Sequence, residues 1–118
     1  MPNYPVNLDR VFQALADPTR RAIVGQLANG SASVGQLAKS HGMGLPAFLQ
    51  HVQVLESCGL ITSAKAGRVR TCQLNGATLT KAEGWLTGQR TVWEDRLDRL
   101  DAYVTELQVK ETDDDREP

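Results

Sequence analysis

The sequence predicts a mainly α-helical domain that carries one small β-hairpin and ends in a long helix. Three observations support this fold class. Apolar residues recur at helical spacing in four short segments before residue 59. Two short segments with β-branched residues follow, separated by a turn that contains Gly67. Apolar residues then step by four and three positions through the C-terminal third, which is typical of a helix packed along another helix.

The length of 118 residues is enough for one hydrophobic core but too short for two. We therefore expect a single domain over residues 1–110, in which residues 79–109 form the long C-terminal helix. The segment ETDDDREP is acidic and lacks apolar side chains, so a disordered tail is predicted over 111–118. No leader peptide is expected, because the N-terminal residues show no basic stretch followed by an apolar run. No membrane span is expected, because no apolar run approaches about 20 residues.

Cap residues predict where the first three helices begin. Asn7 precedes a helix whose apolar positions are Leu8, Val11, Phe12 and Leu15. Asp17 and Pro18 begin the second helix, because Asp accepts free N–H groups and Pro needs no partner at the first position. The apolar residues of this second helix are Ile23, Val24 and Leu27. Ser33 with Gln36 resembles a capping box for a third helix, which carries Val34, Leu37 and Ala38.

A glycine turn and a proline mark the fourth helix. Gly42 and Gly44 supply the turn, and Pro46 fits the first turn of the helix. The inward positions of this helix are Phe48, Val52 and Leu55. Gly59 ends it, and two strands follow, over residues 60–62 and 69–74, joined across 64–68.

Basic residues lie in the hairpin and not in the helix before it. From Met43 to Cys58 there is no Lys or Arg, whereas the hairpin holds Lys65, Arg68 and Arg70. A turn, a short helix and a hairpin with a basic tip, in that order, predict a winged helix-turn-helix. In this arrangement the helix enters a DNA major groove and the hairpin contacts the flanking backbone.

The net charge of −1 conceals an asymmetry along the chain. Residues 1–81 hold eight basic and three acidic residues, whereas the remaining 37 hold five basic and eleven acidic ones. A nearly neutral total therefore does not exclude a polyanionic partner, because binding depends on the local field. The acidic half is interpreted as a solvated helix face and tail.

The C-terminal helix carries a continuous apolar stripe. Leu86 lies seven residues before a series that steps by 4, 3, 4 and 3, namely Trp93, Leu97, Leu100, Val104 and Leu107. Such a stripe packs along a second helix, either within the monomer or in another subunit. Because the helix is long and follows a small domain, we expect a homodimer.

Four segments in order resemble the ArsR/SmtB family of small bacterial winged-helix repressors. They are LADPTRRAIV (Leu15–Val24), GLPAFLQHVQVLESCGLI (Gly44–Ile61), GRVRTCQL (Gly67–Leu74) and WL…R..WEDRLDRLDAY (Trp85–Tyr103). The resemblance covers roughly residues 8–107. It implies a fold of four helices, two strands and a final helix, with dimerisation through the first and last helices. Members repress operons and release DNA when an effector binds. The dimer interface implied here adds Leu8, Val11 and Phe12 to the apolar stripe.

The outer face of the fourth helix is the expected recognition surface. Its residues are Leu45, Ala47, Leu49, Gln50, His51 and Gln53. Gln binds an adenine edge, and Ala or Leu packs on a thymine methyl. Family members usually have Ser near position 49, often Lys or His at 50, and Lys or Arg at 53. The departure removes charged phosphate contacts, so two interpretations stay open: base recognition through Gln and apolar contacts, or weak or absent DNA binding.

The basic side chains of the hairpin are predicted to contact phosphates or a minor groove, with Arg68 at the tip and Lys65 and Arg70 nearby. For His51, a DNA contact and a surface or capping role both stay open. Arg20 and Arg21 could bind phosphate, but pairing with Asp17 or Asp9 is the preferred interpretation.

Metal sensing and enzymatic activity find little support. Cysteines of the family's third-helix metal site would fall near Ser33 and Gly35 and are absent, and the final helix has no His. His41, His51, Cys58 and Cys72 lack metal-ligand spacing. We expect neither metal nor cofactor, and the two cysteines are interpreted as buried fillers, with a redox pair as the alternative. No catalytic constellation is recognised.

The sequence therefore predicts a cytoplasmic homodimeric repressor that binds a roughly palindromic double-stranded DNA operator and is released by an unidentified effector. One alternative is a protein-interaction module that uses the apolar residues Leu45, Leu49 and Val54. Another is a thiol or small-molecule sensor with a ligand among Trp85, Trp93 and Tyr103.

Overall fold

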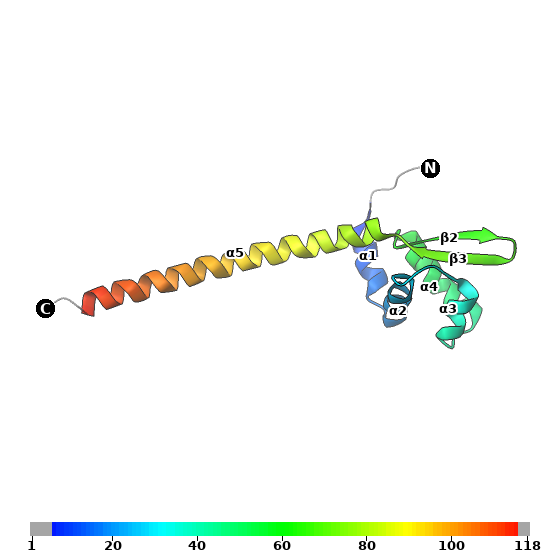
Figure 1. Ribbon diagram of the computed structural model, residues 1–118, viewed down its shortest axis with the longest axis horizontal. Coiled ribbons are helices and arrows are strands. Elements are labelled where there is room, and N and C mark those ends of the chain that lie inside the picture. Colours follow the sequence, from blue (N-terminus) through cyan, green and yellow to red (C-terminus); the bar gives the residue numbers. More distant parts are fainter. Residues whose placement is uncertain (1–5, 116–118) are drawn as a thin grey trace. The chain divides into compact units, whose positions relative to one another are not determined.

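The computed structural model describes residues 6–115 and side chains over 6–111 (Figure 1). The chain divides into two units, Met1–Glu83 and Gly84–Pro118. The first holds every helix and strand that precedes the final helix, together with the beginning of that helix, and the second holds its remainder. The mainly helical winged helix-turn-helix predicted from the sequence is confirmed.

The first two helices begin at the predicted caps. Helix α1 spans Leu8–Leu15, and the Asn7 side chain accepts the N–H groups of Asp9 and Arg10. Helix α2 spans Pro18–Leu27, and the Asp17 side chain accepts the N–H of Arg20. These caps satisfy backbone donors that have no partner within the helix.

Helices α3 and α4 form the helix-turn-helix. The predicted capping box of Ser33 and Gln36 begins α3, which spans Val34–Ser40. Gly42 turns the chain with a φ of 61°, a backbone conformation that favours glycine. Helix α4 spans Leu45–Ser57, with Pro46 in its first turn.

The sheet has three strands, whereas two were predicted. Strand β2 spans Ile61–Ala66 and pairs antiparallel with β3, Val69–Leu74. Strand β1, Ala32–Ser33, pairs with the other edge of β3, giving the order β1-β3-β2. No local pattern could predict so short a strand, because its conformation depends on a neighbour about 40 residues away in the chain. The hairpin turn is also tighter than predicted, since Gly67 adopts a φ of 63° and allows a two-residue loop.

One hydrophobic core joins the elements of the first unit. The α4 residues predicted to face inward, Phe48, Val52 and Leu55, are buried. Every other helix and both strands of the hairpin contribute to the same core, in which the largest fully buried side chains also include Val11, Ile23, Leu60, Ile61 and Cys72. This burial fixes which face of α4 remains exposed.

Helix α5 spans Gly76–Asp115 and is longer than the predicted 79–109. Its beginning is held to the first unit, because the Thr78 hydroxyl donates to the Gly59 carbonyl oxygen at 2.7 Å. At the other end, no Gly or Pro interrupts the chain between Gly88 and Pro118. The helix therefore continues over residues 111–115, which were predicted as part of a disordered tail, and the last three residues of that prediction lie outside the described residues.

Candidate nucleic-acid interface

Helix α4 exposes an uncharged face made of residues that were predicted to contact DNA. Leu45, Ala47, Leu49, Gln50 and Gln53 are exposed, whereas His51 is half-buried. Leu45 and Leu49 expose 50% and 40% of their surface. The face therefore offers amide groups and apolar surface. These groups can hydrogen-bond base edges and contact thymine methyl groups, but they carry no charge that would bind phosphates.

The half-buried His51 ring is held toward α2. Its Nδ1 atom lies 3.3 Å from Nη1 of Arg20 and 3.9 Å from Oδ2 of Asp17. Only the first distance is within hydrogen-bonding range. Nδ1 therefore already has a partner inside the protein, and Nε2 is the ring nitrogen that would be left for a DNA contact.

Arg20 and Arg21 bind the end of α1, which corrects the prediction that they pair with an acidic side chain. Arg20 donates from Nε to the Ala14 carbonyl oxygen at 2.8 Å and from Nη2 to that of Gln13 at 3.2 Å. Arg21 donates from Nη1 to the Leu15 carbonyl oxygen at 2.8 Å. Carbonyls at the end of a helix lack partners and carry partial negative charge, so they attract cations.

Asp17 completes this polar cluster at the beginning of α2. The N–H of Arg20 donates to its Oδ2 at 2.9 Å. This hydrogen bond lowers the pKa of Asp17, and the positive charge of Arg20 lowers it further, while partial burial opposes them. Asp17 is therefore held as a carboxylate, which suits the positive end of a helix.

The hairpin formed by β2 and β3, called here the wing (Ile61–Leu74), places two cations opposite each other. Lys65 pairs with Arg70 across the strands, and like charges in this position repel. Arg70 is partly neutralised by Glu56, whose Oε1 lies 3.9 Å from Nη1, and the same nitrogen donates to the Ser63 hydroxyl at 3.0 Å. A phosphate at the wing would relieve the remaining repulsion.

Lys65 and Arg68 are the cations of the wing that are ready for an external partner. Both are exposed, and neither side chain makes a hydrogen bond or ion pair with another residue that the structure describes. Arg68 lies in the two-residue turn at the tip. These side chains can contact phosphates without first breaking an internal ion pair.

The α5 seam, defined as Leu86, Trp93, Leu97, Leu100, Val104 and Leu107, is unprotected in the monomer. Its side chains are 44–56% exposed. On α1, Leu8 and Phe12 are half-buried, but Val11 is completely buried. Val11 packs in the monomer core and has no surface for a partner, so it is removed from the expected dimer contacts.

The two cysteines are buried and do not form a disulfide. The Cys58 thiol donates to the Leu55 carbonyl oxygen at 3.3 Å. Burial raises the pKa of the Cys72 thiol, Glu56 raises it further, and Arg70 opposes this. Within the described part of the chain, no three His, Cys, Asp or Glu side chains gather around a possible metal position.

We expect both thiols to react slowly in the folded protein. A raised pKa keeps the Cys72 thiol protonated at neutral pH, and the thiolate is the reactive form. Iodoacetamide labelling followed by mass spectrometry should be at least about tenfold slower in buffer than in urea. Equal rates in the two conditions would contradict this burial and favour a thiol sensor.

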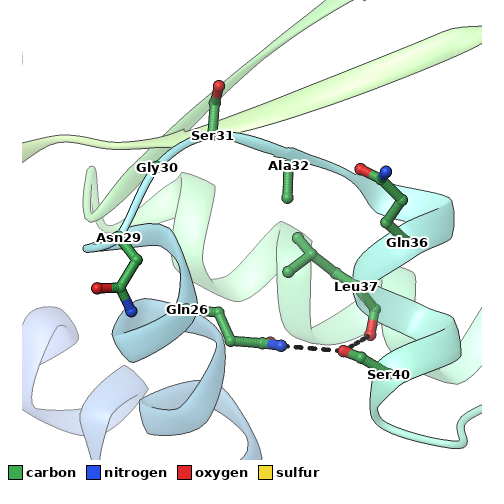
Figure 2. A pocket seen from close by; sticks show the side chains of 8 residues that line it. All are labelled: Gln26, Asn29, Gly30, Ser31, Ala32, Gln36, Leu37 and Ser40. Atoms are coloured by element: carbon green, nitrogen blue, oxygen red, sulfur yellow. Dashed lines mark hydrogen bonds between the residues drawn. The ribbon is translucent and has the colours of Figure 1, made fainter.

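A pocket of about 450 Å³ lies between the end of α2, the segment leading to β1, and α3 (Figure 2). Its lining has no charged side chain. The Gln26 side-chain amide donates to the Ser40 hydroxyl at 3.0 Å, and that hydroxyl donates to the Leu37 carbonyl oxygen at 2.9 Å. The pocket lining is thus uncharged, and its Gln26 and Ser40 side chains already hydrogen-bond within the protein.

Across residues 6–115 no helix combines the length and the apolar character that crossing a bilayer requires.

Comparison with known proteins agrees with this geometry. The helix-turn-helix domain family matches residues 15–64. The HTH-type transcriptional regulator Rv2034 of Mycobacterium tuberculosis is 48% identical over 67 residues, 57% of this chain, and the match spans 63% of that regulator, less than two thirds of its length. The transcriptional repressor SdpR of Bacillus subtilis is 28% identical over 67% of this chain and 88% of SdpR. The crystal structure of the ArsR family transcriptional regulator RHA00566 superposes with a TM-score of 0.70 and 49% identity, covering 74% of this chain and 96% of that one.

Proposed function

The chain belongs to the ArsR family of winged helix-turn-helix transcriptional regulators, a family without enzymatic activity, and we propose that it represses transcription as a homodimer bound to operator DNA. The observation that carries the proposal is an exposed, uncharged α4 face next to a wing whose Lys65 and Arg68 side chains are exposed and make no hydrogen bond or ion pair with another described residue. The similarity to the repressor SdpR supports repression as the outcome.

In the proposed complex the two elements have separate tasks. The α4 face reads the major groove, with Gln50 and Gln53 bonding base edges and Leu45, Ala47 and Leu49 contacting thymine methyl groups. The wing supplies the phosphate contacts through Lys65 and Arg68, with Arg70 contributing less because Glu56 and Ser63 already bind it. Affinity and base recognition would then reside on different elements.

The α5 seam supports dimerisation. Six large apolar side chains on one stripe of a helix form a surface that monomeric proteins rarely leave exposed. Their 3–4 spacing fits packing against a second helix with the same stripe. We propose that the α5 seam of one protomer packs on the same seam of its partner, and that Leu8 and Phe12 of α1 also make dimer contacts.

Release from DNA is proposed to require a small-molecule effector of unknown identity. The aromatic side chains Trp85, Trp93 and Tyr103 are each about half exposed and would border a dimer interface built on α5. Access to chromosomal DNA would place the protein in the cytoplasm.

Footprinting on the DNA upstream of the protein's own gene tests the function. A dimer should protect two half-sites of roughly dyad-related sequence, with centres about 10–10.5 base pairs or a multiple of that apart. Addition of the protein should lower transcription from the same fragment in a purified system. Uniform protection without a dyad, or unchanged transcription at full occupancy, would contradict repression by a homodimer.

A second candidate function is protein recognition by α4. Leu45, Leu49 and Val54 are at least 37% exposed, and no cation accompanies them on the helix. This alternative predicts that Leu49→Ala leaves DNA affinity unchanged while it weakens capture of a protein partner.

A further inference from the structure

We propose that Arg20 and His51 form a positioning pair that fixes α4 against the end of α1, and that His51 acts through this pair rather than by contacting DNA. The inference rests on the proposed function, because operator affinity is one of its two readouts. It assigns His51, half-buried on the recognition helix, a task inside the protein.

The Arg20 guanidinium joins two elements that are separate in the sequence. Two of its nitrogens, Nε and Nη2, donate to the Ala14 and Gln13 carbonyl oxygens at the end of α1. The third, Nη1, lies 3.3 Å from Nδ1 of His51 on α4. One side chain of α2 therefore ties the last turn of α1 to the recognition helix, 31 residues further along the chain.

The chemistry of the pair determines the state of the His51 ring. Arg has donors and no acceptor, so in the proposed pair Nδ1 accepts the hydrogen bond, and the ring then carries its proton on Nε2. The Asp17 carboxylate, 3.9 Å from Nδ1, is too distant to take over this bond. Asp17 instead accepts the Arg20 backbone N–H at 2.9 Å and fixes the first turn of α2, from which the Arg20 side chain projects.

Arg21 shows by contrast what is special about Arg20. Arg21 also donates to an α1 carbonyl, that of Leu15, but within residues 6–111 its side chain makes no hydrogen bond or ion pair with α4. Both arginines therefore stabilise the end of α1, and only Arg20 connects α1 to the recognition helix. Since α1 carries Leu8 and Phe12 of the proposed dimer surface, the pair links that surface to α4.

Replacing His51 with Asn or with Gln separates a positioning role from a DNA contact. The Asn amide oxygen takes the place of Nδ1, whereas the Gln amide reaches the place of Nε2. We expect operator affinity of His51→Asn to stay within about twofold of the wild type. His51→Gln and His51→Ala should each weaken affinity about tenfold, the scale of one hydrogen bond to a charged group. The reverse order, with affinity retained in the Gln variant and weakened in the Asn variant, would overturn the proposal and indicate a DNA contact.

Arg20→Gln and its matched control Arg21→Gln test the other half of the pair. We expect about a tenfold loss of affinity for Arg20→Gln and less than about twofold for Arg21→Gln. The double variant Arg20→Gln/His51→Ala should bind no more weakly than Arg20→Gln alone, because each single change already breaks the bond. Equal losses of affinity for both arginine variants, or additive losses in the double variant, would overturn the proposal.

An NMR measurement on the free protein keeps this inference separate from the proposed function. Ring ¹⁵N shifts of His51 at neutral pH should show an unprotonated Nδ1 and a protonated Nε2, and Arg20→Gln should change them while Arg21→Gln does not. A protonated Nδ1, or ring shifts that Arg20→Gln does not change, would refute the proposed hydrogen bond between Arg20 and His51, even in a protein that binds operator DNA. If the wild type shows the expected shifts but binds no operator, the proposed function fails and the pair stands.

Discussion

Replacement of Leu100 by Glu is expected to convert the protein to a monomer and to lower operator affinity by at least about 100-fold. Leu100 lies in the middle of the α5 seam and is 51% exposed in the monomer. In the proposed dimer a carboxylate there would be buried in apolar surroundings without a partner, which is strongly unfavourable. A monomer binds one half-site only, so it loses the additional affinity that a dimer obtains by binding two half-sites at once.

Sedimentation velocity and fluorescence anisotropy measure the two effects on the same samples. The matched control is Ala102→Glu, which adds the same charge to an exposed position two residues away, roughly on the opposite side of the helix. This control should remain dimeric and bind operator normally. A Leu100→Glu protein that still sediments as a dimer would show that the α5 seam is not the interface.

Replacement of both exposed wing cations, Lys65→Ala with Arg68→Ala, is expected to weaken DNA binding at low salt by at least about 100-fold, as for Leu100→Glu. Each neutralised phosphate releases counterions, so the slope of log affinity against log salt falls by about 0.9 for each phosphate that the variant no longer neutralises. Arg68→Ala alone should flatten the slope by about one unit for each wing that binds DNA. Affinity for unrelated DNA should fall in parallel, since phosphate binding carries no sequence information.

Arg70→Ala provides a control within the same hairpin. Because Arg70 is bound to Glu56 and Ser63, its removal should change the salt slope less than the removal of Arg68. A larger slope change for Arg70→Ala than for Arg68→Ala would mean that the ion pair with Glu56 opens on DNA. That outcome would move the main phosphate contact from the turn at the tip of the wing to Arg70 on strand β3.

Local sequence signals predicted the helices well because caps and turns depend on hydrogen bonds and backbone conformations of residues that are close in the sequence. Asn7, Asp17 and Ser33 each accept an N–H two or three residues further on, and each begins a helix where expected. Gly42 and Gly67 adopt the left-handed backbone that their turns require. The inward set of α4 also followed from spacing alone, because a helix buries the same face along its length.

Contacts between distant segments were not predictable in this way. Strand β1 exists only because β3 lies beside it. Val11 and Phe12 are neighbours on one helix, yet one is buried and the other half exposed, a difference set by how α1 docks on the core. Arg20 was expected to pair with a carboxylate, and its true partners became visible only when the end of α1 and helix α4 were in place.

The most direct test of the proposed function is the salt dependence of affinity for DNA from upstream of the protein's own gene, measured by anisotropy between about 50 and 300 mM salt. We predict tight binding by a dimer at the lowest salt, a steep linear decrease of log affinity as salt rises, and a preference over a scrambled fragment that persists across the range. No binding at the lowest salt would contradict operator binding, and the uncharged face of α4 would then be assigned to a protein partner.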